Sequence, residues 1–401
     1  MRAPDTLDPV ALARWQAALD REATRKAPWL LERKRERMVR SPHAFLRGSA
    51  GLFGRVVALR PELLAGPAGG GWLVGDLHVE NFGAYRGERP TRPRRGDDRV
   101  VFDVNDLDLA ARGPWRFDLV RLTTSVLLAG RERGLDGERA VALARALLVA
   151  WRDVAFGEAR VGASPAAVAR LVGAVGDRTR EAMLASRTAL ARGARRFVRG
   201  PRYVDLAPGR AEKCARAFER YLAALPKSRR PTADEAAVED VAFRVAGTGS
   251  LGMLRVAVLT RGHGPPDGQW VFDMKETVDP PAAEGFGLPD AEPAERVVTA
   301  SRACLERVPR LLGATRVGRR SMLVRRLSPQ EDKLDVGGLD AADLEAVVRH
   351  LGALTGRAHR RGAEAIPRRP WRDADLDAVV ERSIALAGLH VAAWLAWCAR
   401  A

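Results

Sequence analysis

The chain has 401 residues, with 67 Lys and Arg against 50 Asp and Glu, so its formal net charge is +17. With 46% hydrophobic and 29% charged residues, the composition is that of a globular protein, which excludes a disordered, collagen-like or coiled-coil chain. Only six of the cations are lysines, and the arginines are spread through almost every segment. The densest cluster, Arg86 to Arg99, has no interleaved aromatics after Tyr85. This distribution of the positive charge disfavours a nucleic-acid partner.

The cysteines and the apolar stretches indicate where in the cell the protein is located. Cys214, Cys304 and Cys398 have no close spacing, which fits reduced thiols and a cytoplasmic protein. The N-terminal residues lack the apolar segment of a signal peptide. The longest apolar stretch, 384–399, is too short to span a bilayer, so we expect a buried C-terminal helix and no membrane partner.

In the first half of the chain, helical patterns frame a short β-type region. Residues 1–70 are predicted to form short amphipathic helices, because apolar residues such as Leu12 and Leu19 recur at helical spacing. From Gly71 the pattern changes to strand, charged loop, strand, an excursion rich in Arg, Pro and Gly, and a strand that ends at Asp103. Amphipathic helices then continue to about residue 225.

After a predicted linker at 226–234, the pattern becomes that of an antiparallel sheet with one helix. We expect three strands, a helix and two strands, in this order. The six elements are predicted at Val241–Ala246, Met253–Thr260, Trp270–Met274, Ala294–Val308, Ala314–Arg319 and Met322–Leu327. Two helices, at 341–361 and 375–400, close the chain.

The first motif with chemical potential is GDLHVEN at 75–81, between two predicted strands. The carboxylate of Asp76 can accept a hydroxyl proton, and the side-chain oxygen of Asn81, five positions later, can bind Mg²⁺. An ordinary Asx-rich turn has a similar composition, so the neighbouring motifs must decide between the two interpretations.

The second motif is an apolar strand, Val100–Asp103, that ends in a carboxylate and is followed by Asn105, Asp106 and Asp108. Magnesium prefers one or two carboxylates together with phosphate oxygens and water, so hard oxygen ligands at a strand end predict a divalent-cation site. The alternative is a solvated acidic turn.

The third motif is GTGSLG at 247–252. A dinucleotide-binding fold needs a helix directly after the last glycine, and a Walker loop needs Gly-Lys-Ser/Thr, whereas here a strand-like run follows. A glycine turn between two antiparallel strands is instead the arrangement that places backbone N–H groups over ATP phosphates in kinases.

The fourth motif is Lys275, which ends the third predicted strand of the sheet. Protein-kinase-like enzymes carry their phosphate-binding lysine on the third strand, after the glycine loop. Lysine is informative in a chain that otherwise uses arginine, because a compact ammonium between phosphate oxygens is poorly replaced by a guanidinium. The alternative is a surface lysine on an edge strand.

Together these motifs resemble the protein-kinase-like superfamily, and within it the aminoglycoside and choline phosphotransferases. The phrases SPHAFLRG (41–48), GDLHVENFG (75–83) and VFDVNDLD (101–108) also resemble the bacterial family named domain of unknown function 2252, over nearly the whole chain. The kinase resemblance implies an α+β, two-lobed fold with a largely helical lobe and a small antiparallel β-sheet lobe. Because the glycine turn and the lysine follow the 75–81 motif instead of preceding it, the fold is expected to be circularly permuted.

The resemblance also implies roles for individual residues. Asp76 would be the catalytic base, and His78 takes the place of a cation that faces the γ-phosphate. Asp118 would brace the catalytic loop from below. The nucleotide grip is expected at Gly247, Gly249, Ser250, Gly252 and Lys275, and the metal ligands at Asn81, Asp103 and Asp106.

Two assignments stay open. Asp103 and Asp106 compete for the metal. The glutamate that pairs with the phosphate-binding lysine in kinases is to be found among Glu276, Glu292, Glu295 and Glu306.

The expected function is an ATP- and Mg²⁺-dependent phosphotransferase that acts on a small molecule bearing a hydroxyl or an amine. The alternatives are a nucleotide-binding module without turnover and, more distantly, a basic nucleic-acid binder. The expected units are N-terminal helices (1–70), the catalytic and metal motifs with a helical lobe (71–235), the β-sheet lobe (236–330), and a hinge with C-terminal helices (331–401).

Overall fold

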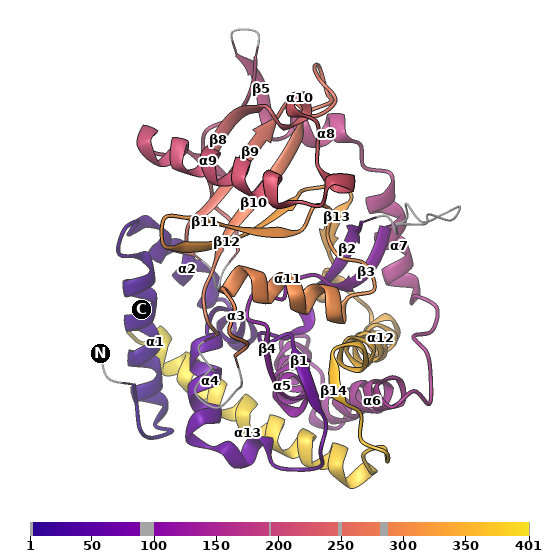
Figure 1. The fold of residues 1–401 in the computed structure, drawn as a ribbon. Helices are drawn as coiled ribbons and strands as arrows, with labels where there is room; N and C mark the ends of the chain where they lie inside the picture. The colour runs from indigo at the N-terminus through magenta and orange to yellow at the C-terminus, as the bar shows by residue number, and fades with distance from the viewer. Residues whose placement is uncertain (1–2, 89–99, 192–193, 248–250, 281–287, 401) are drawn as a thin grey trace.

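A computed structural model describes residues 3–88, 100–191, 194–247, 251–280 and 288–400. The described chain is a mixed α+β protein, as expected, and all its strand pairs are antiparallel. Its longest helices are α5 (Arg116–Glu132), α6 (Gly137–Ala155), α9 (Pro208–Ala224), α12 (Ala341–Arg361) and α13 (Asp373–Cys398). The largest sheet occupies the upper part of the molecule in Figure 1, and α5, α6, α12 and α13 occupy the lower part.

The largest sheet has six strands in the order β11-β12-β10-β9-β8-β7. Its elements are β7 (Tyr203–Val204), β8 (Val238–Arg244), β9 (Arg255–Thr260), β10 (Trp270–Thr277), the helix α11 (Pro293–Cys304), β11 (Gly313–Val317) and β12 (Arg320–Arg326). From β8 onward, the predicted order of three strands, a helix and two strands is confirmed. The glycine turn joins the antiparallel pair β8 and β9, also as predicted.

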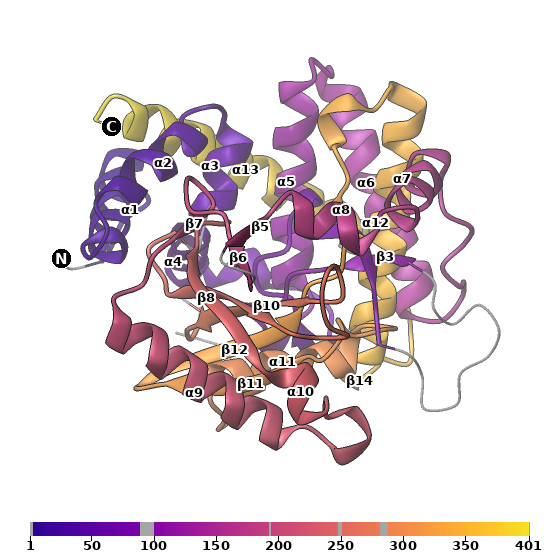
Figure 2. The same ribbon diagram turned by 90° about the horizontal axis from the view of Figure 1, so that it is seen from above.

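The two faces of this sheet differ in character. One face packs on α9 (Figure 2). Phe218 and Tyr221 of this helix contact Phe272 of β10. On the other face, apolar residues at one end of the strands are covered by Leu184 and Phe197. Residues directly opposite in an antiparallel pair share a face, so the register places charged side chains on the rest of this second face. They are Arg255, Asp273, Lys275 and Arg325.

In the lower part, α12 packs tightly on α6. A Cβ atom added to Gly352 would lie 2.1 Å from the carbonyl oxygen of Leu147, and one added to Gly356 would lie 2.4 Å from that of Trp151. Neither position tolerates a side chain without movement of the backbone. Two glycines one helical turn apart therefore allow the close approach of these helices.

The N-terminal segment is helical, as predicted, and it forms four α-helices. They are α1 (Pro9–Thr24), α2 (Trp29–Met38), α3 (Pro42–Gly48) and α4 (Ala50–Leu59). Helix α1 packs on α13. Its C-terminal end also contacts Gly252, which has a φ of +101°. A Cβ atom added to Gly252 would lie 2.3 Å from the carbonyl oxygen of Ala23. Leu30 packs with Val245 and Leu251 beside this contact. The N-terminal helices thus join the lower part to the six-stranded sheet.

Two three-stranded sheets hold the loops that carry the predicted motifs. Their strands are β1 (Gly70–Leu73), β4 (Ala111–Pro114) and β14 (Ala363–Ala365) in one sheet, and β2 (Phe82–Arg86), β3 (Val100–Val104) and β13 (Glu331–Lys333) in the other. Residues 74–81 connect β1 to β2, and residues 105–110 connect β3 to β4. The N–H of Asn105 donates to the carbonyl of Asn81 at 2.9 Å, so the two loops lie side by side.

Several elements of the middle segment were not predicted, and the strand β7 is one of them. Residues expected to be helical form a hairpin of β5 (Thr188–Ala191) and β6 (Ala194–Phe197), and the expected linker contains the short helix α10 (Ala233–Ala236). Contact with the large sheet overrides the helical propensity of the hairpin residues, because Asp240 of β8 accepts the N–H of Phe197 at 2.8 Å. The remaining short helices here are α7 (Ala166–Gly176) and α8 (Arg180–Ala185).

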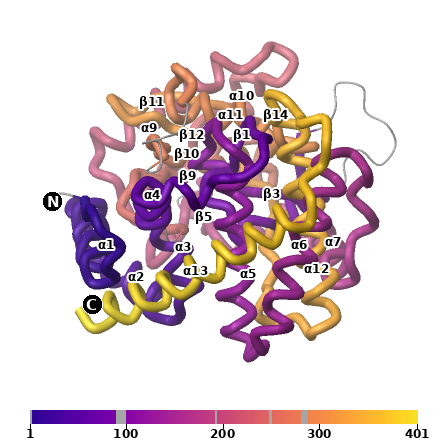
Figure 3. Tube along the Cα trace, turned by 90° about the horizontal axis from the view of Figure 1, so that it is seen from below, coloured from indigo at the N-terminus to yellow at the C-terminus, as the bar shows by residue number. Residues whose placement is uncertain are grey.

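Helix α13 is the one described helix that is long and apolar enough to cross a membrane, by length and composition alone. It packs on α1, α3, α5 and α6 and runs across the underside of the molecule in Figure 3. Ser383 and His390 on this helix are completely buried, whereas Ile384 and Leu395 are exposed. A core helix of a folded domain passes the same test of composition. The predicted C-terminal helix is therefore present, and it is only partly buried.

Candidate functional site

A cavity of about 750 Å³ lies where the charged face of the large sheet meets the loops 74–81 and 105–110 and the helices α1 to α4. Six of the residues predicted for the site line it. They are Asp76, His78, Asn81, Asp106, Gly247 and Lys275. Residues far apart in the sequence thus meet in one cavity. Gly252 is not part of its lining and contacts α1 instead, and Gly249 and Ser250 fall outside the described residues.

Lys275 lies at the centre of the acidic side of the cavity. Its Nζ forms an ion pair with Asp108, and the carboxylate of Asp106 lies 3.9 Å away. Burial would raise the pKa of Asp106, but the positive charges of Lys275 and Lys333 outweigh this effect and lower it. Both neighbours of the lysine therefore come from the loop after β3.

The glutamate partner expected from kinases is not among those that we considered. Glu276 pairs with Arg320, Glu292 with Arg316 and Glu306 with Arg357. No ion pair joins any of these three, or Glu295, to Lys275 in the described part of the chain.

Asp76 lies at the tip of a loop that is held from beneath. The carboxylate of Asp118, at the start of α5, accepts the backbone N–H of Val74 at 2.7 Å and that of Gly75 at 2.9 Å, which confirms the expected bracing role. Asp76 itself pairs with the fully buried guanidinium of Arg121. Burial raises the pKa of Asp76, although the charge of Arg121 opposes the rise. A carboxylate of raised pKa is a better proton acceptor than an exposed aspartate.

His78 is a buried, neutral hydrogen-bonding group. Its Nδ1 accepts the N–H of Glu80 at 3.2 Å, so the proton of the neutral ring is on Nε2. Burial lowers the pKa of His78 well below its ordinary value, and the nearby charges of Arg47 and Lys333 lower it further. The expected cation at this position is therefore replaced by a neutral N–H donor.

Two asparagines, Asn81 and Asn105, line the same cavity as Asp106 and have side-chain oxygens that could bind a cation. The side-chain Nδ2 of Asn81 donates to the carbonyl of Asp76 at 2.5 Å, and the buried Oδ1 of Asn105 has no hydrogen-bond partner. An unpaired buried oxygen beside an ionised carboxylate fits a hard cation such as Mg²⁺, which is typically held by one or two carboxylates. The described residues contain no ready-made cluster of three His, Cys, Asp or Glu, so the remaining ligands of a magnesium ion would be phosphate oxygens and water.

Asp103, one of the two candidates for the metal, does not line the cavity. It is almost completely buried, and its carboxylate pairs with Arg357 of α12 at 2.8 Å and accepts the N–H of Val104 at 2.9 Å. Its place within β3 directs the side chain to the helical side of the small sheet. Asp103 therefore links the small sheet to α12, and Asp106 is the carboxylate that faces the cavity.

A cluster of arginines forms the ceiling of the cavity on the large sheet. Asp273 is buried and pairs with Arg244 at 2.7 Å and with Arg255 at 2.5 Å. Burial would raise the pKa of Asp273, but these two arginines outweigh it and lower the pKa strongly. Arg325, on the neighbouring strand, also lines the cavity and pairs with Glu331 at 3.0 Å. The ceiling therefore has a positive excess.

The N-terminal helices supply the wall of the cavity that faces the glycine turn. They were predicted from the sequence only as short amphipathic helices, without a role in the site. Arg37 and Arg40 from the α2 segment and Arg47 from α3 line the cavity there, and Arg37 donates to the carbonyl of Gly247. Buried Lys34 pairs with Asp20 at 2.6 Å behind them. The sequence feature that marks this wall is the run of cations at 33–47, but the solvated face of an ordinary helix has the same composition.

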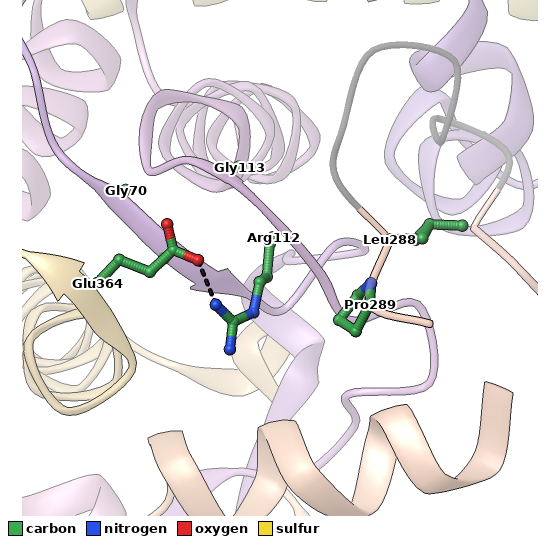
Figure 4. A pocket seen from close by; sticks show the side chains of 7 residues that line it. Gly70, Arg112, Gly113, Leu288, Pro289 and Glu364 are labelled. Atoms are coloured by element: carbon green, nitrogen blue, oxygen red, sulfur yellow. Dashed lines mark hydrogen bonds and ion pairs between the residues drawn. The ribbon is translucent and has the colours of Figure 1, made fainter. Parts of the chain in front are cut away.

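A second hollow, of about 480 Å³, opens along β1 and β4 (Figure 4). Its described charged side chains, Arg112 and Glu364, form an ion pair with each other, and glycine backbone lines much of the rest. It therefore offers no free charge to a ligand, and the larger cavity is the candidate site.

The fold and this cavity define an α+β protein with a strongly charged site between an antiparallel sheet and a set of helices. The chain belongs to the family described as uncharacterized proteins conserved in bacteria, domain of unknown function 2252 (DUF2252), whose profile matches residues 25–399. The resemblance to this family is thus confirmed. Neither a search of curated proteins nor one of solved structures found a match.

Proposed function

We propose that the protein is an ATP- and Mg²⁺-dependent phosphotransferase with a circularly permuted kinase-like fold, and that its acceptor is a small molecule with a hydroxyl or an amine. The observation that carries the proposal is that one cavity joins Lys275 of the third sheet strand to the Asp76–Asn81 loop and to Asp106. The order of elements from β8 to β12 and the glycine turn between β8 and β9 support the same conclusion.

Each group then has a task. With nucleotide bound, Lys275 would exchange its carboxylate neighbours for phosphate oxygens, and Asn81, Asn105 and Asp106 would hold the metal ion. A bound Mg²⁺ neutralises charge on the transferred phosphoryl group and its leaving oxygen. His78 donates its Nε2–H toward the phosphoryl oxygens.

Asp76 completes the chemistry. The acceptor oxygen or nitrogen forms a bond to the γ-phosphorus, the bond from this phosphorus to the β,γ-bridging oxygen breaks, and the acceptor proton passes to the carboxylate of Asp76. Arg121 orients that carboxylate from its buried side.

Binding and turnover of Mg·ATP test the proposal. We expect calorimetric binding of Mg·ATP by the wild type and transfer of ³²P from [γ-³²P]ATP to a component of a small-molecule extract of bacterial cells. Lys275→Ala should weaken Mg·ATP binding by roughly tenfold or more, because it removes a charge-assisted contact. Lys213→Ala, at an exposed lysine of α9, is the matched control and should bind normally.

Asp76→Asn should keep Mg·ATP binding and lose at least about a hundredfold in transfer, since general-base catalysis typically contributes that much. It also leaves the buried Arg121 without its charge partner, so its stability must be measured alongside, and retained nucleotide binding shows that the variant is folded. Full transfer by folded Asp76→Asn would remove Asp76 from the mechanism.

A nucleotide-binding module without turnover is the second candidate, and one observation favours it. Arg121 is fully buried and is committed to Asp76, which restricts the carboxylate as a proton acceptor. Binding of Mg·ATP without transfer to any component of the extract would support this alternative.

A further inference from the structure

Three buried polar side chains from the N-terminal helices meet in the wall of the cavity. Gln16 and Asp20 lie one turn apart on the same face of α1, and Lys34 comes from α2. Lys34 Nζ lies 2.6 Å and Gln16 Nε2 lies 2.8 Å from the same oxygen, Asp20 Oδ1. All three residues line the cavity, although none is more than 4% exposed. They therefore form one cluster, which we call the α1 cluster.

Two oxygens of the α1 cluster have no hydrogen-bond partner in the described part of the chain. Both side-chain contacts of Asp20 use Oδ1, which leaves the buried Oδ2 unpaired. A carboxylate only accepts, so the amide NH₂ of Gln16 faces it, and Oε1, which is also buried and unpaired, is turned away. Lys34 has three N–H donors, and Asp20 is the partner that the structure gives it. Buried polar groups that only support a fold are normally paired, so these groups indicate a ligand.

The two unpaired oxygens are close enough to contact one small group. They are separated by the 2.8 Å hydrogen bond between Gln16 and Asp20 and by the widths of an amide and a carboxylate. Since those widths are each about 2.2 Å, the two oxygens lie within about 7 Å of each other. Two neighbouring hydroxyl groups, each with a hydrogen bond of about 2.8 Å, span that distance.

The α1 cluster favours a neutral ligand group over an ion. A phosphate or a carboxylate would accept from Lys34 but would place its own oxygens against the two unpaired oxygens. An ammonium group would donate to those oxygens but would meet the positive charge of Lys34 and of Arg37, which lines the same cavity. Neighbouring hydroxyl groups both donate and accept, so they match the cluster. Leu19 and Ala23, also on α1, line the cavity and offer apolar contact to a carbon skeleton.

We propose that the α1 cluster is a subsite for a vicinal diol, the pair of neighbouring hydroxyl groups found in sugars and other polyols. One O–H group donates to Asp20 Oδ2 and the other to Gln16 Oε1, while a hydroxyl oxygen accepts from Lys34. The subsite itself is independent of the proposed phosphotransfer, whereas its place in that reaction rests on the proposed function. In the reaction the diol belongs either to the acceptor or to the ribose of the nucleotide, and the experiment separates these two sources.

Two variants remove the unpaired oxygens one at a time. Gln16→Met removes Oε1 and leaves the ion pair of Asp20 with Lys34 in place. Asp20→Asn keeps an oxygen for Lys34 and Gln16 and puts an NH₂ group in the place of Oδ2. It also removes the charge partner of buried Lys34, so its thermal unfolding is measured alongside. Glu22→Gln, at an exposed glutamate of the same helix, is the matched control.

Calorimetry with Mg·ATP and Mg·2′-deoxy-ATP tests the ribose as the source of the diol. If the ribose binds here, Gln16→Met should lose about fivefold in affinity for Mg·ATP, because one hydrogen bond is removed, and should bind the deoxynucleotide as the wild type does. If the acceptor supplies the diol, Gln16→Met should bind both nucleotides as the wild type does. A wild type that binds neither nucleotide contradicts the proposed function, and the subsite is then judged by the extract alone.

A small-molecule extract of bacterial cells tests the acceptor as the source and requires no turnover. Nucleotides are removed on charcoal, and one half of the extract is oxidised with periodate, which cleaves vicinal diols, and is then quenched with sulfite. The other half receives periodate that was quenched beforehand. Saturation-transfer-difference NMR at sub-saturating extract should show CH–OH signals with the wild type and the unoxidised half. Oxidation should abolish them, both variants should reduce them by about fivefold or more, and Glu22→Gln should leave them unchanged.

Dependence on Gln16 and Asp20 in either experiment supports the subsite and identifies the source of its diol. The proposal is overturned if Gln16→Met binds both nucleotides as the wild type does and the extract signals are absent, survive periodate or persist in both variants. An α1 cluster that only closes the wall of the cavity would give that result.

Discussion

Asp118 offers the most quantitative test of how the loop 74–81 is held. Its carboxylate is completely buried and accepts three hydrogen bonds, two from the loop backbone and one from His359 Nε2 at 3.1 Å. Trp151 Nε1 donates to His359 Nδ1 at 3.0 Å, so this nitrogen accepts and the proton of the neutral ring is on Nε2. The imidazole therefore cannot turn into an acceptor while Trp151 is present.

This geometry sets the cost of changing Asp118. In Asp118→Asn, the amide oxygen can replace Oδ2, which serves Val74 and His359, but the NH₂ group then faces the N–H of Gly75. One buried donor is left unpaired, which costs about 1–3 kcal/mol in the free energy of unfolding. Asp118→Ala leaves three donors unpaired and should cost roughly three times as much.

Urea unfolding followed by circular dichroism gives both free energies, with Asp177→Asn, at an exposed aspartate, as the control. We expect Asp177→Asn to lose the least stability, Asp118→Asn to lose more and Asp118→Ala to lose the most. Asp118→Asn should also bind Mg·ATP more weakly, because the loop that carries Asp76 is loosened. If Asn and Ala both cost less than about 0.5 kcal/mol, the carboxylate does not brace the loop.

The other predictions concern packing and pH. Gly352→Ala should destabilise the protein by more than about 1 kcal/mol, because the added Cβ atom would clash with the backbone of α6. Gly388→Ala in α13 should stabilise the protein by about 0.5–1 kcal/mol, because no atom lies within 4 Å of its added Cβ. Urea unfolding measures both free energies. Burial lowers the pKa of His43 to about 3 and those of His350 and His390 to about 4. Because the unfolded chain takes up these protons near pH 6.5, stability should fall by about 1.4 kcal/mol per pH unit per histidine below that pH. The loss levels off near pH 4 for the last two residues, and a flat profile from pH 6.5 to 4.5 would contradict their buried, neutral state.

The sheet and the order of its elements were predictable because their signals are local. Strand-like runs separated by Gly- and Pro-rich turns lie between 238 and 326, with the predicted helix, α11, among them. The hairpin of β5 and β6 was not predictable in the same way. Its alanines, leucine and arginines favour helix, and its strand state depends on a contact with Asp240 that no local pattern reveals.

The candidate site was predictable on one side only. The motifs that supplied Asp76, Asn81, Asp106 and Lys275 carry unusual residue types at fixed spacing, which a sequence displays directly. The choice between Asp103 and Asp106 depended on Arg357, which comes from a helix more than 200 positions further along the chain. Similarly, nothing local distinguishes a cavity-lining arginine of α2 from the solvated face of an ordinary helix.

A crystal structure with Mg²⁺ and a non-hydrolysable ATP analogue tests the central claim most directly. We predict that the γ-phosphate lies between Lys275 and Asp76, that the metal contacts Asp106 and Asn81, and that the glycine turn covers the phosphates. Binding of the analogue at another place on the protein, or failure to bind at concentrations that saturate ordinary phosphotransferases, would contradict a phosphotransferase site in this cavity.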